Sequence, residues 1–200
     1  MRSTGAIALL VIFLVVGFAG CAGCGTYNSL VTQDVTVEEA WSNVETSYQR
    51  RADLIPNLVS TVQGAADFEQ ETLTAVTEAR TRAASIELSA DDLNDSGRVQ
   101  EFLQAQGALG AATGSLINLV REAYPDLGAT EAFRDLQVQL EGTENRINTA
   151  RRDYNAAVAD YNRAVRTFPS NIVAGVTGFD RKTPFEAEAG AEDAPEVSFD

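Results

Sequence analysis

An apolar residue recurs at every seventh position over a long stretch near the C-terminal end of the chain. The row consists of Phe133, Leu140, Ile147, Tyr154, Tyr161 and Phe168. A seven-residue apolar repeat of this length predicts an α-helix that packs along its length against other helices. At about 1.5 Å per residue this helix would be roughly 50 Å long, too long for a compact globule of 200 residues. We therefore expect an all-α fold, an elongated up-and-down four-helix bundle.

A further helix is predicted upstream. Thr36 and Glu39 make a Thr-x-x-Glu capping box, which is typical of a helix start. An apolar stripe behind it recurs at spacings of four and three and consists of Val37, Trp41, Val44 and Tyr48. We place this helix at about 37–51, and its continuation upstream through Leu30 stays open. The stripe projects onto Arg51, so we expect Arg51 to be a buried structural polar residue.

Pro56 interrupts this pattern and leaves two interpretations open. In the first, Asp53 caps a new helix with the proline in its first turn; in the second, Pro56 lies at a kink in one long helix. In both, the apolar face continues to about Ile86. The segment from Ser89 to Gly97 is dense in turn formers and acids, which predicts a solvated loop.

The remaining two helices follow that loop. Apolar residues from Val99 to Val120 predict a helix that ends before Pro125. Within it lie Gly107, Gly110 and Gly114, which either permit close helix contact or simply soften the helix. Thr130 is the expected cap of the long heptad helix, and Pro169 is expected to end it.

The N-terminal segment, residues 1–26, is predicted to be a membrane anchor or a lipoprotein signal. An uncharged run from Ser3 to Thr32 contains the apolar sequence AIALLVIFLVVGFA. This apolar part is short for a membrane span, which takes about 20 residues. It is more like a signal sequence that ends in a cleavage site of small residues. The alternative is an uncleaved transmembrane helix. Either interpretation ties the protein to a membrane.

Two cysteines end this segment. Phe18-Ala19-Gly20-Cys21 resembles the lipobox at which bacterial lipoproteins are cleaved and acylated, so lipidation is predicted at Cys21. Cys24 ends a second small-small-Cys sequence and is the alternative site. Arg2 precedes the apolar run, and the next base, Arg50, lies far downstream. The positive-inside tendency therefore predicts that the body lies on the periplasmic, extracytoplasmic side.

Composition excludes several classes of function. The net charge of −14 argues against nucleic acid, because phosphate binding needs a basic surface. The chain has no histidine, which removes the commonest general base and the commonest metal ligand. No nucleophile with a base and no phosphate-binding loop occurs either. We therefore expect no catalytic residue, no metal site and no cofactor.

Three asparagines lie seven residues apart beside the tyrosines of the heptad row: Asn148, Asn155 and Asn162. One interpretation is a polar groove that binds a peptide or another helix. The favoured interpretation is that these are interior or seam amides that fix the register of the helices. In this interpretation Asn148 is a structural polar residue. If a partner binds here, we expect the exposed patch to include Asn155, Asn162 and Arg166.

The C-terminal tail, residues 169–200, alternates apolar residues with glycine, serine and acids. Glu186 to Asp200 contains no base. Phe179 and Phe185 are costly to leave in water, so we expect the acidic tail to dock partly on a bundle formed by residues 27–168. The final stretch is expected to be loose.

Several separated motifs occur in order along the chain. They are Tyr27-Asn28-x-Leu30-Val31, Ala40-Trp41, the run from Arg50 to Val59, Ala79-Arg80, Arg152-x-Tyr154-Asn155-x-x-Val158-x-x-Tyr161-Asn162, Phe168-Pro169-x-Asn171, Gly178-Phe179 and Phe185-Glu186. Together, from about Tyr27 to Phe199, they resemble the LemA family. The resemblance implies a membrane-anchored helical bundle of the bacterial envelope. It also implies envelope proteins as partners, including a membrane metalloprotease system, and the cysteine-ending leader is similar to lipoprotein-type members.

Two functions fit these expectations. The first is a non-enzymatic envelope scaffold or adaptor that holds other proteins near the membrane. The alternative is a binding module for a small or lipidic ligand in the bundle core. A ligand module would show an open apolar cavity, whereas an adaptor would show a filled core with a groove or patch outside it.

Overall fold

The computed structural model describes residues 2–64 and 69–185, and it places the side chains of residues 13, 23–64 and 69–185. The described part contains helices and no strand, which confirms the all-α fold. The long helices are α1 (Arg2–Gln63), α2 (Gln70–Ala84), α3 (Ser96–Ala123) and α5 (Glu131–Arg166). The short ones are the 3-10 turn η1 (Asp92–Asn94), α4 (Pro125–Gly128) and α6 (Ser170–Thr177).

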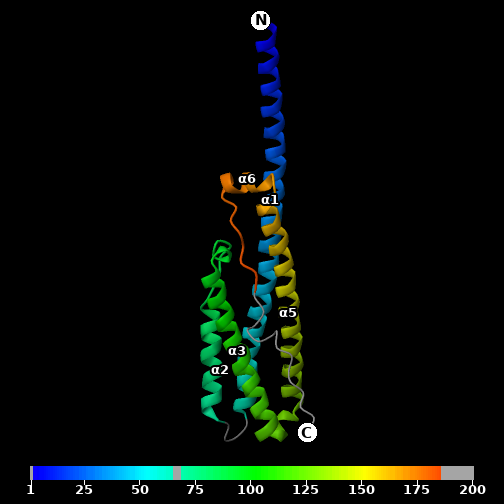
Figure 1. Ribbon diagram of the computed structural model, residues 1–200. Helices are drawn as coiled ribbons and strands as arrows, with labels where there is room; N and C mark the ends of the chain where they lie inside the picture. The colour runs from blue at the N-terminus through cyan, green and yellow to red at the C-terminus, as the bar shows by residue number, and fades with distance from the viewer. Residues whose placement is uncertain (1, 65–68, 186–200) are drawn as a thin grey trace, which may run out of the picture.

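The long helices run up and down in an elongated arrangement (Figure 1). α5 packs along α1, and α2 packs along α3 as a hairpin. α1 extends far beyond the rest of the molecule at its N-terminal end, and α6 lies across it near the point where α1 leaves the bundle (Figure 1). The fold is therefore a long helical pair with a shorter hairpin on its side.

The heptad row of α5 forms the seam against the other helices. Five of its members are at most 5% exposed: Phe133, Leu140, Ile147, Tyr154 and Tyr161. The sixth, Phe168, was expected in the same seam but is 75% exposed. It lies beyond the end of α5 at Arg166, so the helical period no longer controls its direction.

The core divides into an aromatic half and an aliphatic half. In the aromatic half the ring of Trp41 contacts Phe102, Tyr154 and Phe185, with ring centroids 5.3, 5.6 and 5.9 Å apart. The aliphatic half is built by α1, α2, α3 and α5 and includes Ile55, Leu58, Val62, Leu73, Val76, Leu109 and Leu116. The core is thus filled by large side chains from four long helices.

α1 is one continuous helix, which settles the alternatives at Pro56 in favour of a single element. Asp53 caps nothing, and the predicted capping box at Thr36 and Glu39 is wrong. Both residues lie inside α1, where the Thr36 hydroxyl donates to the carbonyl of Thr32 at 2.9 Å. A threonine inside a helix often donates its hydroxyl to the carbonyl four residues before it. The Thr-x-x-Glu pattern therefore occurs inside helices as well as at their starts.

A residue of α2 compensates for the proline inside α1. Pro56 has no N–H, so the carbonyl of Ala52, four residues earlier, lacks its helical donor. The Nε of Arg80 donates to that carbonyl at 2.9 Å. This contact explains how α1 continues through a proline while α2 packs beside it.

α1 and α2 are separate helices, which corrects the prediction of one apolar helix reaching Ile86. α1 ends at Gln63 and α2 begins at Gln70, with Gly64 in a turn after α1. Glycine costs a helix about 1 kcal/mol relative to alanine, which favours a break there. The apolar spacing resumes on α2 with Leu73, Val76 and Ala83 buried, and this continuity concealed the break.

The helices α3 and α5 each begin at a residue whose side chain caps the helix. Thr130 accepts a hydrogen bond from the backbone N–H of Phe133 at 3.3 Å, as predicted for the start of α5. At α3 the cap is Asp95, whose carboxylate accepts from the backbone N–H groups of Gly97 and Arg98. These caps satisfy donors that have no partner within the helix.

Candidate functional site

The amides of Asn155 and Asn162 bind the backbone of the C-terminal tail. The Nδ2 of Asn155 donates to the carbonyl of Phe185 at 2.9 Å, and its Oδ1 accepts from the N–H of Phe185 at 2.8 Å. Asn162 makes the same pair of contacts with Lys182, at 2.8 and 3.0 Å. Each asparagine therefore satisfies both backbone groups of one tail residue, in the way that a neighbouring strand would.

Lys182, the only lysine in the chain, holds the tail to three other elements. It is 7% exposed. Its Nζ lies 3.3 Å from the Oδ1 of Asp34 on α1, donates to the carbonyl of Ala90 at 3.3 Å, and lies 6.0 Å from the centre of the Tyr161 ring. The lone lysine was a signal in the sequence, because a cation buried in an acidic chain needs a specific acidic partner.

The tail also covers the tyrosines of the heptad row. Tyr154 donates its hydroxyl to the carbonyl of Thr183 at 2.9 Å, and its ring lies 4.8 Å from that of Phe185. Burial raises the pKa of both Tyr154 and Tyr161 well above the ordinary value, and for Tyr161 the nearby Asp34 and Asp180 add to the shift. Both tyrosines are therefore structural and neutral.

The structure separates the predicted polar residues into different environments. Asn148 is exposed, so it is not the interior amide that the sequence suggested; its backbone carbonyl accepts a hydrogen bond from the Nε of Arg152. Arg166 is exposed at the end of α5. A partner could reach the amides of Asn155 and Asn162 only by displacing the tail, and partner binding by this patch stays a prediction.

Arg51 is buried, 4% exposed, between the two halves of the core. Its Nη1 donates to the Oε1 of Glu144 at 2.8 Å, and its Nη2 donates to both the carbonyl and the Oε1 of Gln106, each at 2.8 Å. The guanidinium carbon also lies 5.1 Å from the centre of the Tyr48 ring. One side chain of α1 thus connects α3 with α5, where these two helices leave a gap between them.

An open groove lies over Arg51 between α3 and α5. Its volume is about 840 Å³, and its walls include Gln100, Gln104, Gly107, Glu144, Asn148 and Arg151. A second hollow of about 630 Å³ continues it and includes Gly110, Gly114, Arg121, Gln137 and Asn145. Gly110 and Glu144 line both, so the two form one long channel, which we call the α3–α5 groove.

Three of the glycines of α3 line this groove, namely Gly107, Gly110 and Gly114. A Cβ atom added at Gly107 or Gly114 would meet nothing within 4 Å, whereas at Gly110 it would lie 3.4 Å from the Nη1 of Arg51. Of the two alternatives, close contact with another helix of this chain is therefore not what these glycines provide, and the softer helix stays a prediction. Instead the glycines widen the groove, because they leave the surface of α3 without side chains there.

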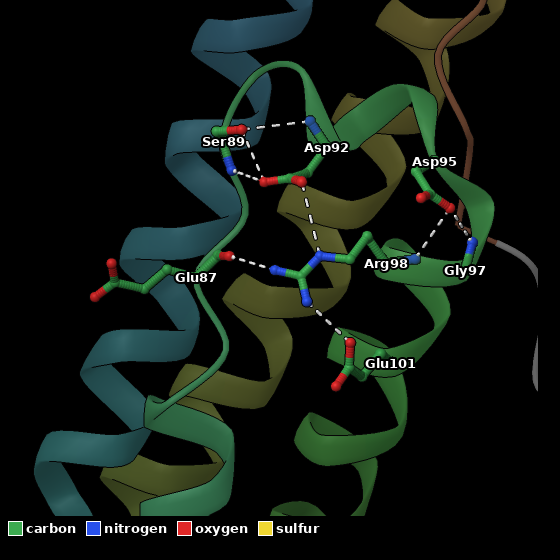
Figure 2. A network of polar contacts seen from close by, with 7 residues as sticks. All are labelled: Glu87, Ser89, Asp92, Asp95, Gly97, Arg98 and Glu101. Atoms are coloured by element: carbon green, nitrogen blue, oxygen red, sulfur yellow. Dashed lines mark hydrogen bonds and ion pairs between the residues drawn. The ribbon is translucent and has the colours of Figure 1, made fainter.

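A polar network closes the tip of the α2–α3 hairpin (Figure 2). The carboxylate of Asp92 accepts from the N–H and hydroxyl of Ser89 and lies 3.6 Å from the Nε of Arg98, and these contacts lower its pKa. Arg98 also bonds Glu101 and the carbonyl of Glu87. Within the described residues no cluster of three or more acids and cysteines is arranged to hold a metal ion.

The described cysteine lies in an apolar corner between α1 and α6. Cys24 is exposed and unbonded, and the corner of about 510 Å³ around it is lined by Gly23, Tyr27, Ile172, Val173 and Val176. The side chain of Cys21 lies outside the described residues. Among the helices whose side chains the structure places, none is long and apolar enough to cross a membrane.

Comparison with known proteins adds the family. The LemA family model matches residues 40–199. Magnetosome protein MamQ 2 of Paramagnetospirillum magneticum is 31% identical, over 86% of this chain and 68% of its own length. Protein LemA of Metamycoplasma hominis is 25% identical, over 83% of this chain and 71% of its own length. Because one family model covers the bundle from Ala40 onward, including the tail with its asparagine contacts, the chain belongs to the LemA family.

Proposed function

We propose that this protein is a non-enzymatic, membrane-anchored adaptor of the bacterial cell envelope, which holds other envelope proteins through the α3–α5 groove. The observation that carries the proposal is the contrast between a filled core and an open groove on the side. A ligand module would need a cavity among the core side chains. In this chain Trp41, Phe102 and Tyr154 fill that space with their rings.

The groove fits an α-helix of a partner protein. It runs between two long helices, and the glycines of α3 let a third backbone approach closely. Its walls carry amides and both signs of charge, with Arg121 and Arg151 toward the two ends and Glu141 and Glu144 between them. Such a surface selects a partner by charge pattern, as polar helix interfaces do.

The anchor and the location come from the sequence. The uncharged run of residues 3–32, with cysteines at its end, supports attachment to a membrane, with the body on the extracytoplasmic side. Magnetosome protein MamQ 2 is named for an organelle, and this name supports a role in organised cell structures. A membrane metalloprotease system is one candidate partner, from the family resemblance.

The experiment fills the groove without touching the core. Full-length protein with Gly107→Trp or Gly114→Trp is crosslinked in intact cells, and its partners are recovered from the membranes and identified by mass spectrometry. The added indole enters open space, so folding should be unaffected while a bound helix is excluded. We expect specific partners to fall by about tenfold or more, equivalent to about 1.4 kcal/mol of lost binding.

Gly142→Trp is the matched control. Gly142 lies in α5, outside the groove-lining set, and its added Cβ also meets nothing within 4 Å. The control should recover the same partners as the unsubstituted protein, at an unchanged melting temperature. Equal recovery from all three variants would mean that this groove is not the interface, and turnover of a substrate by the purified protein would refute the adaptor proposal.

A further inference from the structure

α6 presents an apolar face that no part of the described chain covers. Ile172 and Val176 are four residues apart, and so share one helix face, and they are 58% and 83% exposed. The opposite face packs on the bundle through Val173 and Ala174, the latter 3% exposed. Phe168, just before the helix, is 75% exposed. α6 itself carries no charged residue.

This face is directed toward the N-terminal part of α1. Ile172 and Val176 line the apolar corner together with Gly23, Cys24 and Tyr27 of α1. Beyond that corner α1 continues as a helix away from the rest of the molecule, with α6 lying crosswise to it (Figure 1). Residues 3–33 of α1 contain no charged side chain. The exposed face of α6 is therefore continuous with the segment that we expect to enter a membrane.

The surroundings of α6 have the charge and aromatic character of a membrane surface contact. The stretch from Arg163 to Lys182 has four bases and one acid, Asp180, whereas the whole chain has 15 bases and 29 acids. Arg166 and Arg181, on either side of α6, are exposed. The rings of Tyr27 and Phe179 contact each other at 5.7 Å beside α6. Aromatic rings favour the interface between lipid and water, and arginines attract anionic headgroups.

We infer that α6 is a second membrane contact, a short helix that lies in the headgroup boundary of the same lipid bilayer that holds the N-terminus. Phe168, Ile172 and Val176 enter the upper acyl region, and Arg166 and Arg181 contact anionic lipid headgroups. The bilayer surface then lies at the level of Cys24 and Tyr27 on α1. This inference rests on the membrane anchoring in the proposed function, and it holds for a lipidated cysteine as well as for a transmembrane helix.

Depth-dependent fluorescence quenching tests the position of α6. The full chain carrying Val176→Trp is reconstituted in vesicles of phosphatidylcholine and phosphatidylglycerol, with bromine on the upper acyl chains of the phosphatidylcholine. The emission of Trp41, which is 5% exposed in the core, is subtracted by using the unsubstituted protein. Because a face buried about 5–10 Å into the boundary lies beside these bromines, the introduced indole should lose about half of its emission.

Val138→Trp is the matched control. Val138 is also an exposed valine, 67% exposed, and it lies on α5 far from α6. Its indole should emit as in water and lose less than about a tenth of its emission to the bromines. The inference fails if the two indoles are quenched equally little. It also fails if the indole at position 176 is shielded from water yet unquenched, because a second protein copy would then cover α6.

Vesicle flotation separates this inference from the proposed anchoring. The unsubstituted chain should float with the vesicles. A chain that floats while the indole at position 176 stays in water overturns only the α6 contact. A chain that does not float overturns the membrane anchor and, with it, the α6 contact.

Discussion

Asn155 and Asn162 act as two clamps for one segment of the tail. Each side-chain amide pairs with both the N–H and the carbonyl of a single residue, Phe185 or Lys182. The tail segment there is extended and has no strand beside it, so these amides satisfy backbone groups that would otherwise be buried without partners. The seven-residue spacing places both clamps on the same side of α5.

Removal of either clamp should destabilise the protein. We expect Asn155→Ala or Asn162→Ala to lower the free energy of unfolding by about 1–3 kcal/mol, because two buried backbone groups lose their partners at once. Chemical denaturation of the full-length protein in detergent measures the change. Asn148→Ala is the control, since Asn148 is exposed and its side chain holds no residue of the described part of the tail; its effect should stay within about 0.5 kcal/mol. Equal losses at all three positions would contradict the clamp.

The sequence predicted a polar groove or seam at these asparagines, but not its occupant. The repeat of Tyr and Asn on α5 is visible as a period of seven, and two of the three amides lie in a seam. The period of seven could not show that the bound peptide is the chain's own tail, because the signals for docking, the lone Lys182 and the apolar Phe185, lie in the tail and not in the repeat. Asn148 shares the same spacing and is exposed, so the period of seven alone does not decide whether an asparagine is buried.

At the scale of the helices, Pro56 and Arg80 form a pair across α1 and α2. Arg80 donates to the carbonyl of Ala52 that proline leaves without its helical partner. We expect Arg80→Met to cost about 1–3 kcal/mol in the natural sequence. In a Pro56→Ala background the new N–H of residue 56 can bond that carbonyl, so the same change at Arg80 should cost at least about 1 kcal/mol less.

A double-mutant cycle measures this coupling. The four proteins are the unsubstituted chain, the two single variants and the double variant, each unfolded by denaturant. Additive effects, within about 0.5 kcal/mol, would show that Arg80 does not compensate for the proline. An increase in stability from Pro56→Ala alone would not decide the matter, because it is expected from helix propensity in either case.

Helix type was easier to predict than helix ends. The apolar periods indicated the long helices, and Thr130 was correctly placed as the cap of α5. The break after Gln63 was missed because the apolar spacing resumes in register on α2, and the Thr36 capping box was wrong because Thr36 bonds a carbonyl within α1 instead. The local amino-acid sequence does not distinguish a helix end from a helix interior at these positions, because the outcome depends on which helices pack together.

At the scale of the whole molecule, the tail connects the α2–α3 hairpin to the α1 and α5 pair. Thr183 donates its N–H to the carbonyl of Leu93 at 2.8 Å, and Lys182 bonds the carbonyl of Ala90 at the same tip. On the other side the tail is held by α5 and by Asp34 of α1. These polar contacts thus add to the burial of Leu88 and Leu93 in the aromatic half of the core, and together they attach the tip of the hairpin to the rest of the protein.

Removal of the tail should loosen that tip more than any other part of the hairpin. We expect a chain that ends at Gly178 to take up deuterium faster at residues 86–95, while the other end of the hairpin, near the start of α2, keeps its protection. Hydrogen exchange with mass spectrometry measures this. A chain that ends at Phe185 keeps every contact described here and serves as the control. Uniformly faster exchange throughout the shortened chain would instead mean that the tail supports global stability only.

The uninterrupted course of α1 makes the molecule a spacer of fixed length. From Cys24 to Arg51 the helix rises roughly 40 Å at about 1.5 Å per residue, and the α3–α5 groove opens over Arg51. A flexible linker would allow the groove to approach the membrane, whereas a helix keeps it at one height. On the proposed anchoring and groove interface, a partner in the same membrane can bind only if its own binding segment reaches that height, so the height of this segment becomes a condition for binding beside its sequence.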